Sequence, residues 1–200
     1  IKTDPYQFAD LWRGEYQPSM ERIRSGSRGY VPLDTLHLEN LETVLERLGL
    51  TSHFTTDEMR SLNRAWEQLP AWPDSTSGIA SIRKKAFVAP CSNGSIALMT
   101  RIARFTGINW DCILGAEIAQ TYKPNPQAYL RSVHALGLEP REVVMVAAHN
   151  DDLFAARECG LRTAFLARTT EYGKNQKTDL APAATWDFIA ENIDELSNLA

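Results

Sequence analysis

Residues 143–160 read VVMVAAHNDDLFAARECG, and this stretch decides the fold. Its first part, residues 143–148, is a short and continuous apolar run, which is typical of a strand buried on both faces of a sheet. Residues 152–159 have helical spacing and end before Gly160, and glycine often closes a helix. A buried strand that leads directly into a helix predicts a parallel α/β sheet, with the polar residues His149-Asn150-Asp151-Asp152 at the turn.

The same alternation extends to both sides of this stretch. Short apolar runs bounded by turn residues predict the strands, and segments with cap signals predict the helices between them. The predicted strands are residues 84–91, 111–118, 143–148 and 163–167, and the predicted helices are residues 95–106, 126–136, 152–159 and 186–199. Residues 76–200 are therefore predicted to form a Rossmann-like α/β core with a parallel sheet covered on both faces.

The amino-terminal third of the chain has a different pattern. Between residues 6 and 69 the apolar residues recur at steps of three and four, and no strand-like alternation interrupts them. Asp34 and Thr35 occupy an N-cap position and Gly49 closes a helix. We expect residues 1–75 to form a separate α-helical subdomain.

Composition excludes several functional classes. The chain has 200 residues, 44% hydrophobic and 23% charged, with a formal net charge of −4 and scattered basic residues. Such a chain predicts a soluble cytoplasmic protein that binds no nucleic acid and no membrane. The cysteines Cys91, Cys112 and Cys159 lack CxxC spacing, so neither a disulfide framework nor a structural zinc site is expected.

Polar residues follow three of the predicted strands, where ligands bind in open α/β sheets. They are Ser92-Asn93-Gly94, Lys123 and the run from His149 to Asp152. Each has an ordinary alternative when taken alone: a turn, a surface lysine and a helix N-cap. Because all three follow strands of one sheet, we expect them to meet at one edge.

These three segments resemble motifs of the haloacid dehalogenase superfamily. Cys91-Ser92-Asn93-Gly94 resembles its second motif, Tyr122-Lys123-Pro124-Asn125-Pro126 its third, and residues 144–153 (VMVAAHNDDL) its fourth. The separations allow one βα unit between consecutive motifs. The resemblance implies that the helical subdomain is a cap inserted into the core, and the L-2-haloacid dehalogenases of this superfamily fit best.

The resemblance also implies a reaction and roles for named residues. An aspartate displaces halide from a short-chain L-2-haloacid, which can include fluoroacetate, and water cleaves the resulting ester to a 2-hydroxy acid. No metal or other cofactor is implied, the partner is the small 2-halocarboxylate, and a homodimer is an option. The implied roles are halide binding by Arg13, carboxylate binding by Ser92 and Asn93, orientation of the nucleophile by Lys123, an active-site hydroxyl from Tyr129, and water activation by Asp152 with His149 and Asn150.

Two alternatives remain open. The superfamily's Mg²⁺-dependent phosphatases carry an aspartate four residues before the last one of the fourth motif, and here that position is Ala148, although Asp151 is a substitute ligand. A degenerate, non-catalytic member is the second alternative, because no Asp-x-x-Gly-Thr motif for the nucleophile precedes Trp12. We expect the natural protein to carry that motif upstream of Ile1 if it is active. Ala147 and His149 also depart from the serine and asparagine frequent in these dehalogenases.

Overall fold

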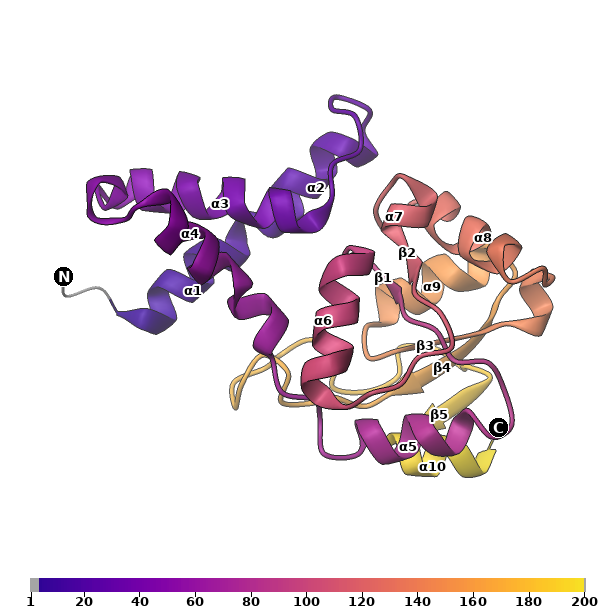
Figure 1. Cartoon of the computed structure of the whole chain (residues 1–200). Coiled ribbons are helices and arrows are strands. Elements are labelled where there is room, and N and C mark those ends of the chain that lie inside the picture. Colours follow the sequence, from indigo (N-terminus) through magenta and orange to yellow (C-terminus); the bar gives the residue numbers. More distant parts are fainter. Residues whose placement is uncertain (1–3, 200) are drawn as a thin grey trace.

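In the computed structural model, which describes residues 4–199, the chain is helical up to residue 68 and forms strands only from residue 91 onward (Figure 1). The helices of the first region are α1 (Pro5–Gly14), α2 (Tyr16–Arg24), α3 (Leu33–Arg47) and α4 (Thr56–Asn63), with 3₁₀ turns at Thr51–His53 and Arg64–Gln68. Local sequence explains their starts. Asp4 accepts a hydrogen bond from the backbone N–H of Tyr6, and Thr55 forms a capping box with Glu58.

The helical region has its own apolar cluster. Its fully or nearly buried members are Trp12, Leu41, Val44 and Leu45. Trp12 also donates a hydrogen bond from Nε1 to the backbone carbonyl of His37 at 2.8 Å, so its polar edge is satisfied inside the cluster. This contact ties α1 to α3.

The second region alternates strands and helices. Its strands are β1 (Cys91–Ser92), β2 (Leu114–Gly115), β3 (Val144–Ala147), β4 (Arg162–Leu166) and β5 (Phe188–Ala190). They form two parallel sheets, one of β1 and β2 and one in the order β3-β4-β5. The helices are α5 (Ser75–Ile82), α6 (Ile96–Thr106), α7 (Ala116–Ala119), α8 (Pro126–Ala135), α9 (Asn150–Glu158) and α10 (Ile193–Leu199), with a 3₁₀ turn at Pro140–Glu142.

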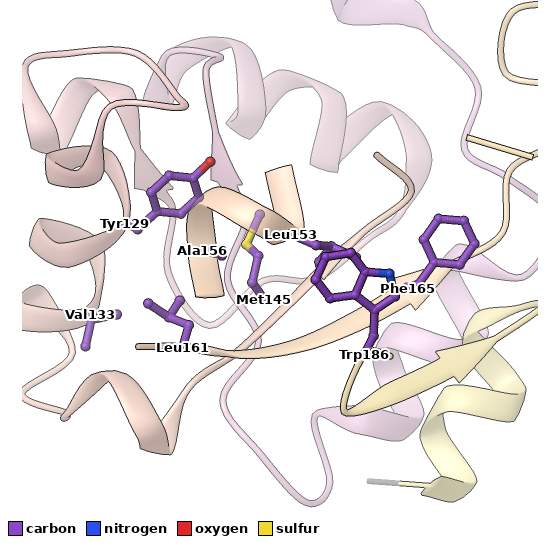
Figure 2. Packing of buried hydrophobic residues seen from close by; sticks show 8 residues of the cluster. All are labelled: Tyr129, Val133, Met145, Leu153, Ala156, Leu161, Phe165 and Trp186. Atoms are coloured by element: carbon purple, nitrogen blue, oxygen red, sulfur yellow. The ribbon is translucent and has the colours of Figure 1, made fainter. Parts of the chain in front are cut away.

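One apolar cluster fixes α8 and α9 against the larger sheet. Its buried members are Tyr129, Val133, Met145, Leu153, Ala156, Leu161, Phe165 and Trp186. Burial of one such large side chain contributes about 1.5–3 kcal/mol. The hydroxyl of Tyr129 points away from Val133 and Leu161 (Figure 2), so the ring packs in the core while its polar end reaches the candidate site.

The parallel α/β fold predicted from sequence is confirmed, but three predicted elements were wrong in extent. Residues 84–90 form no strand, because Val88 donates its N–H to the carboxylate of Asp111 rather than to a neighbouring strand. Residues 116–118, predicted to be strand, belong to helix α7. Residues 188–190, predicted to be helix, form β5 because they pair with Ala164–Leu166 of β4.

The chain passes between its two regions beside its own carboxyl-terminal helix. Helices α5 and α10 lie side by side (Figure 1), and a Cβ at Gly78 would stand 2.3 Å from Ile193 Cγ2, so glycine allows their close approach. Asp74 accepts hydrogen bonds from Arg168 Nη2 and from the backbone N–H of Ile193, each at 2.8 Å. Within residues 4–199 we find no helix with the length and apolarity that a membrane span requires.

Candidate active site

An ion pair between Lys123 and Asp152 forms the centre of the candidate site. Lys123 Nζ lies 2.5 Å from Asp152 Oδ2, and Tyr129 donates its hydroxyl proton to Asp152 Oδ1, also at 2.5 Å. The side chains of Lys123 and Asp152 are only 16% and 15% exposed. Asp152 lies in the first turn of α9, Tyr129 in α8 and Lys123 in the loop before α8. Residues from two predicted motifs therefore meet at one carboxylate.

The tyrosine in this cluster is a hydrogen-bond donor and not a base. Burial, together with the charge of Asp152, raises the pKa of Tyr129 above its ordinary value. The phenol stays protonated near neutral pH and holds one carboxylate oxygen, while Lys123 holds the other. The Asp152 carboxylate is thus fixed in orientation.

The main chain of Lys123 is held from both regions. Its N–H donates to Asn93 Oδ1 at 2.9 Å, and its carbonyl accepts from Arg24 Nη1 at 2.9 Å. The Lys123–Pro124 peptide bond is cis. The loop that carries the lysine is therefore connected both to the turn after β1 and to helix α2.

The turn after β1 carries Ser92 and Asn93. The Ser92 hydroxyl oxygen accepts the N–H of Gly94 at 2.9 Å, which leaves the hydroxyl proton available to a ligand. Gly115 of β2 lies against this turn with φ +114°, and a Cβ there would stand 2.1 Å from the Ser92 carbonyl oxygen. Only glycine permits this approach, which fixes the backbone beneath Ser92.

The guanidinium of Arg13, near the end of α1, lies 4.0 Å above the centre of the Tyr16 ring. Tyr16 accepts a hydrogen bond from Asn93 Nδ2 at 3.3 Å. Burial raises the pKa of Tyr172, and the positive charge of Arg13 opposes this rise. Tyr16 thus links the predicted halide-binding arginine to the predicted carboxylate-binding asparagine.

His149 immediately precedes α9, and its side chain contacts the loop after β4. Its Nε2 lies 2.9 Å from Glu171 Oε2 and 3.1 Å from the Tyr172 hydroxyl, and its ring stacks on that tyrosine with centroids 6.1 Å apart. The hydrogen bond to Glu171 raises the pKa of His149 against the opposing effect of burial. Protonation of the imidazole is therefore favoured relative to a free histidine.

Asn150 points away from the Lys123–Asp152 pair. Its Nδ2 donates to Asp179 Oδ1 and to the Ala181 carbonyl, and its Oδ1 accepts from Ala183 N–H and Trp186 Nε1. These four partners all lie in the loop before β5. The catalytic role that the resemblance gave to Asn150 stays a prediction, and the structure does not bring its amide to the cluster.

The other predicted residues fall into two groups of contacts. In the first, Arg13 lies over Tyr16, Tyr16 bonds to Asn93, Asn93 bonds to the main chain of Lys123, and Lys123 pairs with Asp152. In the second, His149 contacts Tyr172 and Glu171. Sequence reasoning missed Tyr16, Glu171 and Tyr172. The spacing of Tyr16, three residues after Arg13, is a signal that could have found it, whereas the loop of Glu171 and Tyr172 has no regular pattern.

The site is rich in groups that bind anions. Lys123 and Arg13 contribute positive charge, and the Ser92 hydroxyl contributes a neutral donor. Within the described part of the chain, His, Cys, Asp and Glu side chains do not gather in threes as a metal site would need. Asp151, the substitute ligand of the phosphatase alternative, is exposed on α9.

Several known proteins are similar to this chain in fold and in sequence. A model of the haloacid dehalogenase-like hydrolase family matches residues 3–160. The crystal structure of a defluorinating L-2-haloacid dehalogenase is 46% identical, with a TM-score of 0.96 over 100% of this chain and 82% of the other. A second L-2-haloacid dehalogenase structure is 40% identical, with a TM-score of 0.94 over 98% of this chain and 84% of the other.

A curated relative is more distant. The (S)-2-haloacid dehalogenase of Xanthobacter autotrophicus is 27% identical over 167 residues, which cover 80% of this chain and 63% of the relative. The chain thus spans less than two thirds of that relative's length. The resemblance inferred from three motifs is confirmed by the family match, and the chain belongs to the haloacid dehalogenase-like hydrolases.

Proposed function

We propose that this protein hydrolyses short-chain L-2-haloacids to 2-hydroxy acids through an aspartyl-ester intermediate. The observation that carries the proposal is the Asp152 carboxylate held by Lys123 on one oxygen and by Tyr129 on the other. The identity of the two dehalogenase structures, 46% and 40%, supports the same substrate class. Because the first of these is a defluorinating dehalogenase, we extend the proposal to fluoroacetate.

The first step of the proposed reaction is displacement at carbon. A carboxylate oxygen attacks C2 of the haloacid, the carbon–halogen bond breaks with inversion, and halide leaves with the bonding electron pair. Arg13 binds the halide, Ser92 and Asn93 bind the substrate carboxylate, and Lys123 keeps the nucleophile ionised. The Asp-x-x-Gly-Thr motif that carries the nucleophile in the family is not among these 200 residues, so the proposal requires that the natural protein provide it.

The second step is hydrolysis of the ester. Asp152 accepts a proton from water, and the hydroxide adds to the ester carbonyl carbon. The C–O bond to the product then breaks, Asp152 returns the proton to the leaving alkoxide oxygen, and the nucleophilic carboxyl group loses its own proton to solvent, which restores the carboxylate. His149 would donate to or orient this water, since Glu171 favours its protonated form. Tyr129 and Lys123 hold Asp152 for this task.

We also propose that residues 1–75 act as the cap and residues 76–200 as the core of the enzyme. Contacts between the two support this division: Arg24 to the Lys123 carbonyl, Asn93 to Tyr16, and Tyr122 to the Val31 carbonyl at 2.5 Å. The homodimer that the resemblance allows stays a prediction, which the molecular mass in solution would test.

The test is halide release by the protein as its gene encodes it, including any residues before Ile1. We expect release from L-2-chloropropionate and not from the D enantiomer, with no loss in EDTA. Fluoride release from fluoroacetate tests the wider proposal separately. Activity that EDTA abolishes and Mg²⁺ restores, or turnover of an aryl phosphate, would replace the proposal with the phosphatase alternative, and no activity on either class would indicate a degenerate member.

A further inference from the structure

We propose that Tyr16 is a positioning residue, which holds the Arg13 guanidinium over the site with its ring and connects it to Asn93 with its hydroxyl. This inference rests on the proposed function, because that function gives Arg13 and Asn93 their ligands. Tyr16 belongs to none of the motifs of the core. Its role follows from two contacts made by opposite parts of one side chain.

The ring provides the first contact. Arg13 Cζ lies 4.0 Å from the ring centroid, well inside the range in which a guanidinium is attracted to an aromatic face. Arg13 is exposed, and within residues 4–199 it forms no ion pair with a carboxylate. A long, exposed side chain loses rotamer freedom when it binds a ligand, and a ring that already supports it reduces this loss.

The hydroxyl provides the second contact. Asn93 Nδ2 donates to Tyr16 Oη at 3.3 Å, while Asn93 Oδ1 accepts the N–H of Lys123 at 2.9 Å. The amide of Asn93 therefore bridges the tyrosine and the loop of the central lysine. Through this bridge, the position of Arg13 depends on the same turn that carries Ser92.

Tyr16 is itself fixed from within the helical region. Its carbonyl accepts the hydroxyl of Ser19 at 3.0 Å, and Asn40 Nδ2 donates to Ser19 Oγ at 3.2 Å, with Ser19 and Asn40 both buried. The ring also lies against His37, with centroids 5.9 Å apart. A residue whose backbone and ring are both held is suited to position a mobile neighbour.

A double-mutant cycle with Arg13 tests the proposal. We expect Tyr16→Leu to raise the KM for L-2-chloropropionate about tenfold in the wild-type background. When Arg13→Gln is already present, Tyr16→Leu should change KM less than about twofold, because both substitutions disrupt the same contact between the guanidinium and the ring. Tyr16→Phe keeps the ring and loses the hydroxyl, so its effect should lie between wild type and Tyr16→Leu. Tyr6→Leu, which replaces a tyrosine 82% exposed on α1, is the matched control and should leave KM unchanged.

Two outcomes would overturn the proposal. One is additive effects of Tyr16→Leu and Arg13→Gln on KM, and the other is a Tyr16→Leu effect confined to kcat. If Tyr16→Leu does not fold, the cycle of Tyr16→Phe with Arg13→Gln decides in the same way.

Calorimetric titration with bromide, the ligand class assigned to Arg13, separates this proposal from the proposed function, because it needs no turnover. Coupled losses of bromide affinity in an enzyme without halide release would reject the function alone. Additive losses in an enzyme that releases halide would reject the role of Tyr16 alone.

Discussion

The two sides of the first turn of α9 use polar residues for opposite purposes. Asp152 faces Lys123 and Tyr129 at the candidate site, whereas Asn150 faces the loop before β5 and holds it with four side-chain hydrogen bonds. Two positions separated by two residues lie about 200° apart around a helix. Neighbouring polar residues of one motif can therefore divide into one that serves chemistry and one that serves architecture.

The largest expected effect would come from the site side of this turn. Asp152→Asn removes the carboxylate that accepts the proton from water, and we expect halide release to fall about 10³-fold. Asparagine preserves the shape of the side chain but leaves Lys123 without its buried counter-charge, so we expect a lower melting temperature, and the rates are compared below it. If the variant keeps more than a tenth of the wild-type rate, Asp152 is not the base and the comparison fails.

Substitution of Asn150, on the side of the turn that faces the loop before β5, should show the reverse pattern, with a loss of stability. Asn150→Ala removes four hydrogen bonds, which contribute about 1 kcal/mol each, so we expect the free energy of unfolding in urea to fall by up to about 4 kcal/mol. Asp151→Ala, at an exposed neighbouring position, is the matched control. A variant Asn150→Ala that folds with wild-type stability but releases no halide would instead assign Asn150 the catalytic role that the sequence predicted.

His37 extends the comparison to the helical region, as a buried polar residue with a structural role. Burial lowers the pKa of His37 to about 4, below the unfolded value of about 6.5. The unfolded chain therefore binds more protons between these values, and stability should fall by up to about 3 kcal/mol as pH drops from 6.5 to 4. Urea unfolding across this pH range should show a smaller fall in His37→Gln.

The control for this measurement is His134→Gln, which removes an exposed histidine of α8. An equal change in both variants would contradict a special role for His37. An acid-induced loss that His37→Gln leaves intact would contradict it as well.

The smallest expected effect concerns His149, which immediately precedes α9 and contacts the loop after β4. Glu171→Gln should lower the pKa of His149, because the hydrogen bond to Glu171 is the main cause of its rise. The raised pKa means that the pair stabilises the fold at low pH and loses this contribution as pH rises through the folded value. Since His149 is 40% exposed, we expect less than about 1 kcal/mol in stability.

Nuclear magnetic resonance titration of the imidazole measures this shift, with His149→Asn to assign the signal. An unchanged titration in Glu171→Gln would show that Glu171 does not set the charge of His149. The charge of His149 would then be set by its other neighbours.

Sequence patterns predicted the parts of the fold that depend on local order. The apolar run and helix around residues 143–160 became β3 and α9, and the motif resemblance brought Lys123, Tyr129 and Asp152 to one site. Strand β5 was missed because three residues carry no periodicity and only the pairing with β4 defines them. The period of 3.6 residues could have separated Asn150 from Asp152, although it could not identify the partners of Asn150.

Contacts between distant segments account for the rest. Tyr16 meets Asn93 across 77 positions of the chain, and His149 meets Glu171 across 22. No local pattern encodes such pairs, since they depend on how the two regions pack. The helical region was therefore predicted as a set of helices, but its contribution to the site beyond Arg13 was not.

Through its contacts with Asp74, the carboxyl-terminal helix α10 holds the segment that connects the helical region to α5. Asp74 binds both Arg168 and the first N–H of α10, immediately before α5 begins and just after the chain leaves the helical region. Removing residues 193–200 would thus free the connecting segment before α5. Because Ile193 and Leu196 also pack against Ala164 and Leu166 of β4, we expect this truncation to loosen the sheet and the link to the helical region together.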